Sequence, residues 1–183
     1  MKKLLVFETI SIDGYFVDAH GDMSWAHYGR ADPEFADWVG GNASAGGDLL
    51  FGRKTYQMME AFWPTPVAEQ QMPVVAKGMN ARTKYVASRT IQPTWNNTHL
   101  LNGDLVNSVR ELKAGDGPGI AVLGSGSIVA LLGEAGLVDE YQFVIVPVAL
   151  GGGRTVFTRR CSLRLLDQRV FRCGNVVVTY ATA

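Results

Sequence analysis

The chain has 183 residues, of which 47% are hydrophobic, 10% aromatic and 19% charged. This composition supports a sizeable core and excludes a disordered chain. Seventeen lysines and arginines balance seventeen aspartates and glutamates, so no broad basic surface indicates a nucleic acid partner. The length predicts a single domain over residues 1–183.

Metal, secretion and membrane signals are weak. Cys161 and Cys173 form no CxxC pair and the three histidines are scattered, so we expect no metal site. The N-terminal apolar run stops at Glu8, too short for a signal peptide. No apolar run approaches the roughly 18 residues that cross a bilayer. We therefore expect a soluble, cytoplasmic protein without membrane contact.

The first predicted elements are a strand, a loop and a helix. Residues 3–10 form a β-rich run that ends before the Asp13-Gly14 turn, and a polar loop follows as far as Arg30. Asp32-Pro33-Glu34 has the features of a helix start: a capping side chain, a proline at the first position and an acid in the first turn. The glycines of Gly40-Gly41-Asn42 are expected to end this helix.

The remaining elements alternate and then end in a hairpin. In chain order the sequence predicts a strand at 48–51, helices at 53–62 and 70–80 (the second interrupted at Pro73), strands at 84–87 and 98–101, a helix at 104–113, a strand at 120–123, a helix at 128–135, and strands at 140–146, 163–171 and 176–180. Strand–helix alternation followed by a hairpin predicts an α/β fold. Its mixed sheet is mostly parallel, with a C-terminal antiparallel hairpin and helices on both faces.

Two strand-to-helix turns have residues that suit phosphate. In Gly52-Arg53-Lys54-Thr55, glycine permits close backbone approach, the helix start offers free N–H groups and two cations follow. Gly124-Ser125-Gly126-Ser127 lacks the lysine of a Walker P-loop, and Val129 replaces the third glycine of a Rossmann fingerprint. Its glycines and hydroxyls at a helix start still suit a pyrophosphate.

For the first turn, a glycine turn followed by two solvated basic residues is an equal alternative; for the second, it is a turn required only by packing. Ligands of open α/β sheets bind beyond the carboxyl ends of strands, so two such turns together favour a dinucleotide. A third strand end, Tyr85 to Thr90, places Ser88 and Arg89 after a strand. Arg89 and Arg53 together suit a 2′-phosphate, which favours NADP over NAD. A solvated strand end is the alternative for Arg89.

These sites, in this order, resemble the dihydrofolate reductase superfamily. They are closer to the reductase domain of bacterial riboflavin biosynthesis and its stand-alone relatives. The similarity spans nearly the whole chain, and the matching stretches are residues 11–16, 21–25, 52–56, 84–89, 122–127, 137–140 and 147–153. The resemblance implies a dihydrofolate-reductase-like fold, NADPH as the hydride donor and a homodimer.

The resemblance also implies roles for individual residues. The pyrophosphate and adenosine phosphates would be held by Gly52, Arg53, Lys54 and Thr55. The 2′-phosphate would lie between Ser88 and Arg89. Beneath the pyrophosphate and nicotinamide ribose would pass Gly124, Ser125, Gly126, Ser127 and Ile128.

The sequence departs from the superfamily pattern in two places. Ser125 stands where the family has its second glycine, which only adjusts the turn. Dihydrofolate reductases bind the pterin with an acid on the first helix; here Asp32, Glu34 and Asp37 are candidates, but the segment does not align. This second departure weakens a folate substrate.

The activity implied by the resemblance is hydride transfer from NADPH to a small heterocycle. A ribosylaminopyrimidine is the type of substrate implied, as for a 5-amino-6-(5-phosphoribosylamino)uracil reductase. No deaminase domain and no zinc ligands are found, so the bifunctional riboflavin enzyme is not expected. A dihydrofolate reductase proper and a non-catalytic NADP-binding module are the alternatives.

Hydride addition to a C=N or C=O group also needs a proton donor. Asp13 is the candidate, because it follows the first strand, where burial beneath a nicotinamide ring would raise its pKa. The alternative is that Asp13 only shapes the turn with Gly14. Glu8 is less favoured, because its side chain within the strand can face either side.

The candidate for substrate contact is Trp25, in the loop after Gly21-Asp22. A large aromatic ring there can cover a flat ligand. A comparably weighted alternative is that Trp25 is only a hydrophobic anchor. Trp38 is expected in the core beneath the first helix.

Overall fold

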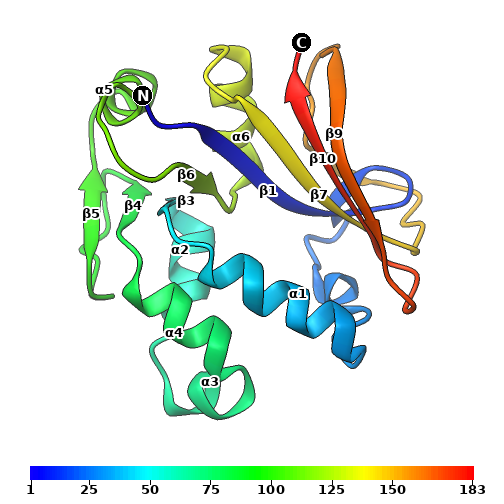
Figure 1. Ribbon diagram of the computed structural model, residues 1–183. Helices are drawn as coiled ribbons and strands as arrows, with labels where there is room; N and C mark the ends of the chain where they lie inside the picture. The colour runs from blue at the N-terminus through cyan, green and yellow to red at the C-terminus, as the bar shows by residue number, and fades with distance from the viewer.

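The computed structural model describes all 183 residues and has one large central sheet flanked by helices (Figure 1). The strands of this sheet lie in the order β5-β4-β3-β6-β1-β7-β10-β9. They are β1 (Leu4–Ser11), β3 (Asp48–Gly52), β4 (Lys84–Ala87), β5 (Thr98–Leu101), β6 (Ile120–Val122), β7 (Glu140–Val146), β9 (Leu163–Val170) and β10 (Val176–Thr182).

Neighbouring strands from β5 to β7 are parallel, and β10 and β9 are antiparallel additions at one edge. The predicted mostly parallel sheet with a C-terminal hairpin is therefore confirmed. The carboxyl ends of β4, β3, β6 and β1 meet at one edge of the sheet, called the carboxyl edge below.

Helices cover both faces, as predicted. They are α1 (Pro33–Ser44), α2 (Arg53–Glu60), α3 (Pro66–Gln71), α4 (Pro73–Ala81), α5 (Leu105–Ala114) and α6 (Gly126–Glu134). Figure 1 shows α1 running across one face with α4 beside it. None of these helices is long and apolar enough to span a membrane.

Alternating side chains of β3 divide the core between the two faces. Leu50 packs in the cluster that includes Val109 of α5 and Leu132 of α6. Leu49 and Phe51 pack in another cluster with residues of α4. All five residues of β3 are buried, as expected of a central parallel strand.

The start of α1 agrees with the sequence prediction, but its end does not. The Asp32 carboxylate accepts a hydrogen bond from the Phe35 N–H at 3.0 Å, as an N-cap does. The helix then continues through Gly40 and Gly41 to Ser44. Gly40 is buried, and a β-carbon there would lie 3.4 Å from Val74 of α4, so this glycine serves the close crossing of two helices.

Two short strands and the start of α6 also differ from prediction. The expected loop after Gly14 contains β2 (Tyr15–Asp18), which pairs with β8 (Gly153–Thr155) in a separate two-stranded sheet. A β-carbon on Gly153 would lie 2.0 Å from the Val17 carbonyl oxygen, so glycine permits this pairing. The helix α6 starts at Gly126, two residues before the expected Ile128.

Candidate active site

The two predicted glycine-rich turns touch each other at the carboxyl edge. The Gly52 N–H donates a hydrogen bond to the Gly124 carbonyl oxygen at 2.9 Å. A β-carbon on Gly52 would lie 2.4 Å from Ser125 Oγ and 3.1 Å from Ser125 N. Glycine at position 52 is therefore required for the two turns to pack this closely.

The β6–α6 turn presents two hydroxyls at the start of α6. Gly124 has a φ of +92°, a left-handed conformation that favours glycine. Ser125 Oγ and Ser127 Oγ lie 3.0 Å apart, and the Ser125 hydroxyl does not cap the helix. Both hydroxyls are therefore free of the helix backbone and are suited to bind an anion at the N-terminal end of α6.

Ile128 is less available to a ligand than its neighbours. Its side chain is 8% exposed and packs in the main core. Its N–H donates to the Ser125 carbonyl oxygen at 3.0 Å. The role of Ile128 in cofactor binding stays a prediction.

The third predicted stretch lies beside the first. Gly52 of β3 is paired with Ala87 of β4, so the residue after β4, Ser88, follows at the same edge. The Ser88 hydroxyl accepts a hydrogen bond from the Thr90 N–H at 3.2 Å, which shapes the turn that bears Arg89. The structure thus brings the three predicted cofactor stretches to neighbouring strand ends.

Three cations at this edge have no carboxylate partner. Arg53, Lys54 and Arg89 are exposed, and none takes part in the ion pairs of the structure. Cations without a carboxylate partner at the N-terminal end of a helix, as Arg53 and Lys54 are in α2, are the chemistry that binds phosphate. These residues therefore fit the phosphates of a dinucleotide.

Asp13 is exposed, and its carboxylate accepts several hydrogen bonds. The N–H groups of Leu150 and Gly151 donate to it at 3.0 and 2.7 Å, and the Ser11 hydroxyl donates at 2.5 Å. The Ser11 and Gly151 hydrogen bonds hold the pKa of Asp13 below its ordinary value. The expected rise in its pKa is wrong, because these donors stabilise the ionised form. Its acid role stays a prediction, and its contacts fit the task of fastening the loop after β7.

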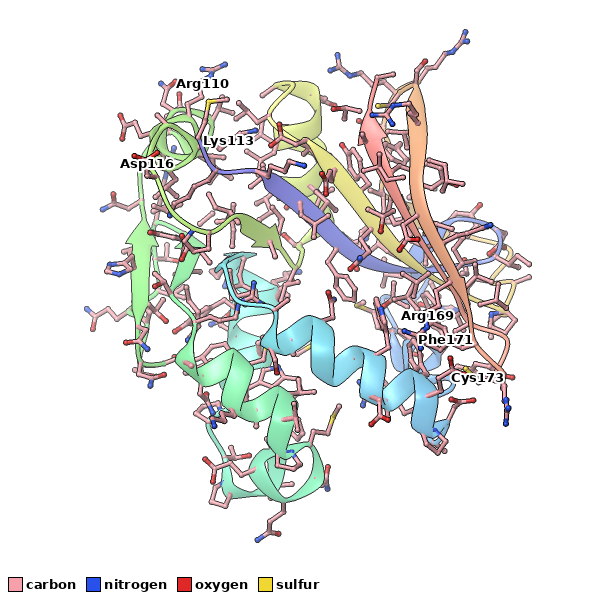
Figure 2. The ribbon with its side chains drawn as sticks, in the orientation of Figure 1. Arg110, Lys113, Asp116, Arg169, Phe171 and Cys173 are labelled. Atoms are coloured by element: carbon pink, nitrogen blue, oxygen red, sulfur yellow. The ribbon has the colours of Figure 1, made fainter.

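Trp25 and Trp38 pack on the same aromatic cluster. Trp38 stacks on Phe35 with ring centroids 5.9 Å apart, and Phe35 contacts Phe171 at 5.1 Å. Trp25 packs against this cluster too, and its indole N–H donates to the Asp22 carbonyl oxygen at 3.2 Å. Figure 2 shows Phe171 near the N-terminal end of α1, at the hairpin of β9 and β10. The core position of Trp38 is confirmed, whereas substrate contact by Trp25 stays a prediction.

Sequence reasoning gave too little weight to Glu8 and did not single out Phe16. Glu8 is 8% exposed, and burial raises its pKa to about 8. A β-carbon on Gly126 would lie 2.2 Å from Phe16 Cζ, so the Phe16 ring packs directly on the second turn. The signal for Glu8 lies in the alternation of β1. Leu4 and Val6 are both in the main core, and side chains two residues apart in a strand share a face, so Glu8 lies on that face too.

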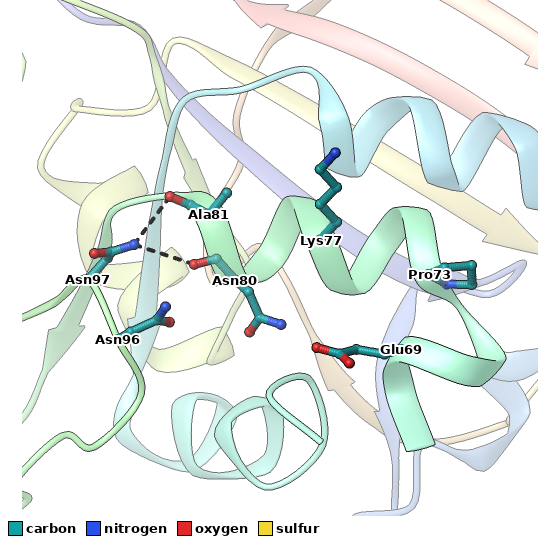
Figure 3. Close-up of a pocket in the computed structure, with 7 residues that line it drawn as sticks. All are labelled: Glu69, Pro73, Lys77, Asn80, Ala81, Asn96 and Asn97. Carbon is teal, nitrogen blue, oxygen red and sulfur yellow. Dashed lines mark hydrogen bonds between the residues drawn. The ribbon is translucent and has the colours of Figure 1, made fainter. Parts of the chain in front are cut away.

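A surface pocket lies elsewhere. It has a volume of about 500 Å³, and Figure 3 shows the residues that line it: Glu69, Pro73, Lys77, Asn80, Ala81, Asn96 and Asn97. The Asn97 amide donates to the Ala81 carbonyl oxygen at 3.4 Å. Asn97 precedes β5 and Ala81 ends α4 ahead of β4, so this cavity is at the edge opposite the glycine-rich turns.

Comparison with known proteins identifies the family. The model of the RibD C-terminal domain matches residues 2–179. The chain belongs to this family. A curated relative of this RibD C-terminal domain protein is the uncharacterized protein YyaP of Bacillus subtilis, 26% identical over 98% of this chain and 94% of YyaP.

Solved structures show that the fold of this RibD C-terminal domain protein is that of dihydrofolate reductase. A protein named for riboflavin biosynthesis from Shewanella sp. PV-4 has a TM-score of 0.70 at 22% identity, over 99% of both chains. A pyrimidine reductase-like protein from Corynebacterium diphtheriae has a TM-score of 0.62 at 12% identity, and the match covers 100% of this chain and 92% of that one. Dihydrofolate reductase from Enterococcus faecalis, complexed with NADP(H) and RAB-propyl, has a TM-score of 0.64 at 14% identity. This match covers 98% of this chain and 96% of that one.

Proposed function

We propose that this protein is an NADPH-dependent reductase of a small heterocyclic substrate, of the ribosylaminopyrimidine type. The observation that carries the proposal is the junction of three strand ends at one edge. There, Arg53, Lys54 and Arg89 have no carboxylate partner beside two touching glycine-rich turns. Membership of the RibD C-terminal domain family and the fold shared with an NADP(H)-bound dihydrofolate reductase support it.

The proposed site divides between binding and chemistry. Arg53 and Arg89 would bind the 2′-phosphate, and the backbone and hydroxyls of residues 52–55 and 124–127 would bind the pyrophosphate. When bound, the dihydronicotinamide supplies a hydride. The protein orients the two reactants and provides a proton.

Replacing both Arg53 and Arg89 with alanine is expected to remove the preference for NADPH over NADH. Each guanidinium would make charge-assisted bonds to the 2′-phosphate, so we expect the double variant to bind NADPH at least about tenfold more weakly. NADH lacks that phosphate, so its affinity should change little. Calorimetric titration of both proteins with both cofactors measures this; equal affinity of the wild type for NADH and NADPH would contradict the assignment.

The activity is tested by NADPH oxidation with a panel of ribosylaminopyrimidines, dihydropterins and quinones. The proposal expects turnover with a ribosylaminopyrimidine. Turnover with dihydrofolate alone would instead indicate a dihydrofolate reductase. Tight NADPH binding without any turnover would indicate a non-catalytic module.

A homodimer is part of the proposal, and β9 offers a surface for a second copy. It is the edge strand, and Leu166 and Val170 are 43% and 67% exposed. Antiparallel pairing of two copies about Gln168 would place Leu166 opposite Val170 and Asp167 opposite Arg169. Sedimentation equilibrium distinguishes this dimer from a monomer.

A further inference from the structure

One buried acid at the carboxyl edge is not used by the proposed phosphate contacts. Val6 of β1 is paired with Val122 of β6, and two residues farther along each chain Glu8 lies beside Gly124. A β-carbon on Gly124 would be 3.6 Å from Glu8 Oε2 and 3.2 Å from Thr55 Oγ1. The Glu8 carboxyl therefore lies beside Gly124, one of the two glycines at which the glycine-rich turns meet.

The surroundings of Glu8 keep its carboxyl neutral. Its neighbours are Phe143, its partner in β7, and Gly124 of the β6–α6 turn, with Thr55 of α2 on the far side of Gly124; none of the three carries a charge. Burial raises its pKa to about 8, opposed only by a backbone hydrogen bond from Thr9, and no charged group contributes. At neutral pH most molecules thus hold a proton on this side chain.

Glu8 is buried but retains a small exposed surface. Glu8 keeps 8% of its surface exposed, and it takes part in no ion pair. This exposed fraction is the route by which, in the proposal below, a substrate atom or one water would reach the Glu8 proton.

We propose that Glu8 is the proton donor of the reductase, acting directly or through one water. This inference rests on the proposed function. A substrate carbon of a C=N or C=O group accepts the hydride, and the electron pair of the broken π bond moves to nitrogen or oxygen. The Glu8 O–H bond breaks as its proton passes to that atom, and water returns a proton to the carboxylate afterwards.

Glu8 fits this role better than Asp13 does. A general acid works best with a pKa near the working pH and with its proton in place. Asp13 is ionised at neutral pH, because the Ser11 and Gly151 hydrogen bonds lower its pKa. Glu8 of β1 also lies beside Gly124, the residue of the β6–α6 turn whose carbonyl oxygen accepts the hydrogen bond from Gly52.

The test compares Glu8→Gln with Asp13→Asn, and with Glu111→Gln as a matched control on the exposed surface of α5. Hydride transfer is followed as single-turnover NADPH oxidation across a pH series. The wild-type rate should fall about tenfold per pH unit above pH 8, because the reaction needs protonated Glu8. Glu8→Gln should be roughly a hundredfold or more slower at neutral pH and lose that alkaline decline. Asp13→Asn and Glu111→Gln should keep the alkaline decline of the wild type.

A second measurement does not depend on turnover. In protein without cofactor, the carbon-13 shift of the Glu8 carboxyl, assigned by its loss in Glu8→Gln, should titrate near pH 8. Titration near pH 4.5, or wild-type turnover that Glu8→Gln retains undiminished, would overturn the assignment of Glu8 alone. No turnover by the wild type with any substrate would overturn the proposed function, and the assignment with it.

Discussion

Replacing Glu8 with glutamine is expected to raise the free energy of unfolding near pH 8 while leaving it almost unchanged below about pH 4.5. The pKa of Glu8 is raised by burial from 4.5 to about 8 in the folded protein. Between these values the unfolded chain has released the proton and the folded chain still holds it. The stability contributed by protonated Glu8 is therefore fully present below pH 4.5 and is lost as the pH rises through 8.

The size of this effect follows from the shift. The loss is about 1.4 kcal/mol for each pH unit, and on the order of 5 kcal/mol over the whole window from pH 4.5 to about 8. Glutamine keeps the shape of the neutral acid and does not ionise, so the variant escapes this loss. Glu8 thus lowers the stability of the folded protein near neutral pH. Such a cost is expected of a residue that is kept because the activity needs it.

Urea unfolding of both proteins over a pH series measures the difference. All other ionisable groups are common to the two chains, so the difference isolates Glu8. Glu111→Gln, an exposed residue without an ion pair, provides the control and should follow the wild type. If the free energy of unfolding changed with pH in the same way for Glu8→Gln and the wild type, the raised pKa of Glu8 would be contradicted.

The second large effect is expected at Gly126. A β-carbon there would lie 2.2 Å from Phe16 Cζ and 2.7 Å from Cε1. The Phe16 ring is 6% exposed in the main core, with the Arg154 guanidinium 5.2 Å from its centroid, so it has little room to move. Gly126→Ala should lower the free energy of unfolding by roughly 1–3 kcal/mol. It should also weaken NADPH binding, because the β6–α6 turn must shift.

Gly41→Ala is a matched control for this substitution. Gly41 is an exposed glycine within α1, and a β-carbon there would meet nothing within 4 Å. Alanine should stabilise this helix by up to about 1 kcal/mol. Both glycines are helical, so helix propensity alone predicts the same sign for both variants. Stabilisation by Gly126→Ala would contradict the packing of Phe16 on the turn.

The sequence predicted best where structure is local. The strands at 84–87, 98–101 and 140–146 have the predicted bounds, because each is a short apolar or alternating run between turn residues. The cap at Asp32 depends on a side chain three residues from its partner, Phe35. Such features are contained in a few consecutive residues and need no knowledge of the rest of the chain.

Prediction failed where a residue's role depends on a distant segment. Gly40 looks like the end of a helix until Val74 of α4 is placed against it. The pKa of Asp13 depends in part on the N–H groups of Leu150 and Gly151, 137 and 138 residues away. These are tertiary contacts that residue type and spacing do not reveal.

The candidate site shows the same division. The strand-to-helix turns were recognisable from glycines and hydroxyls in consecutive positions. That Gly52 and Gly124 touch, and that Glu8 lies beside Gly124, depends on the register among β3, β6 and β1. Local patterns therefore identified the candidate phosphate-binding turns and left the buried acid undecided.

The central claim is that NADPH binds at the carboxyl edge of the sheet, and mapping of backbone amide NMR shifts during NADPH titration tests it most directly. The account predicts the largest changes at residues 52–55, 88–89 and 124–127, where the unpaired cations and the two touching turns lie. Changes confined to the cavity around Asn80 and Asn97 at the opposite edge, or no changes at saturating NADPH, would contradict it.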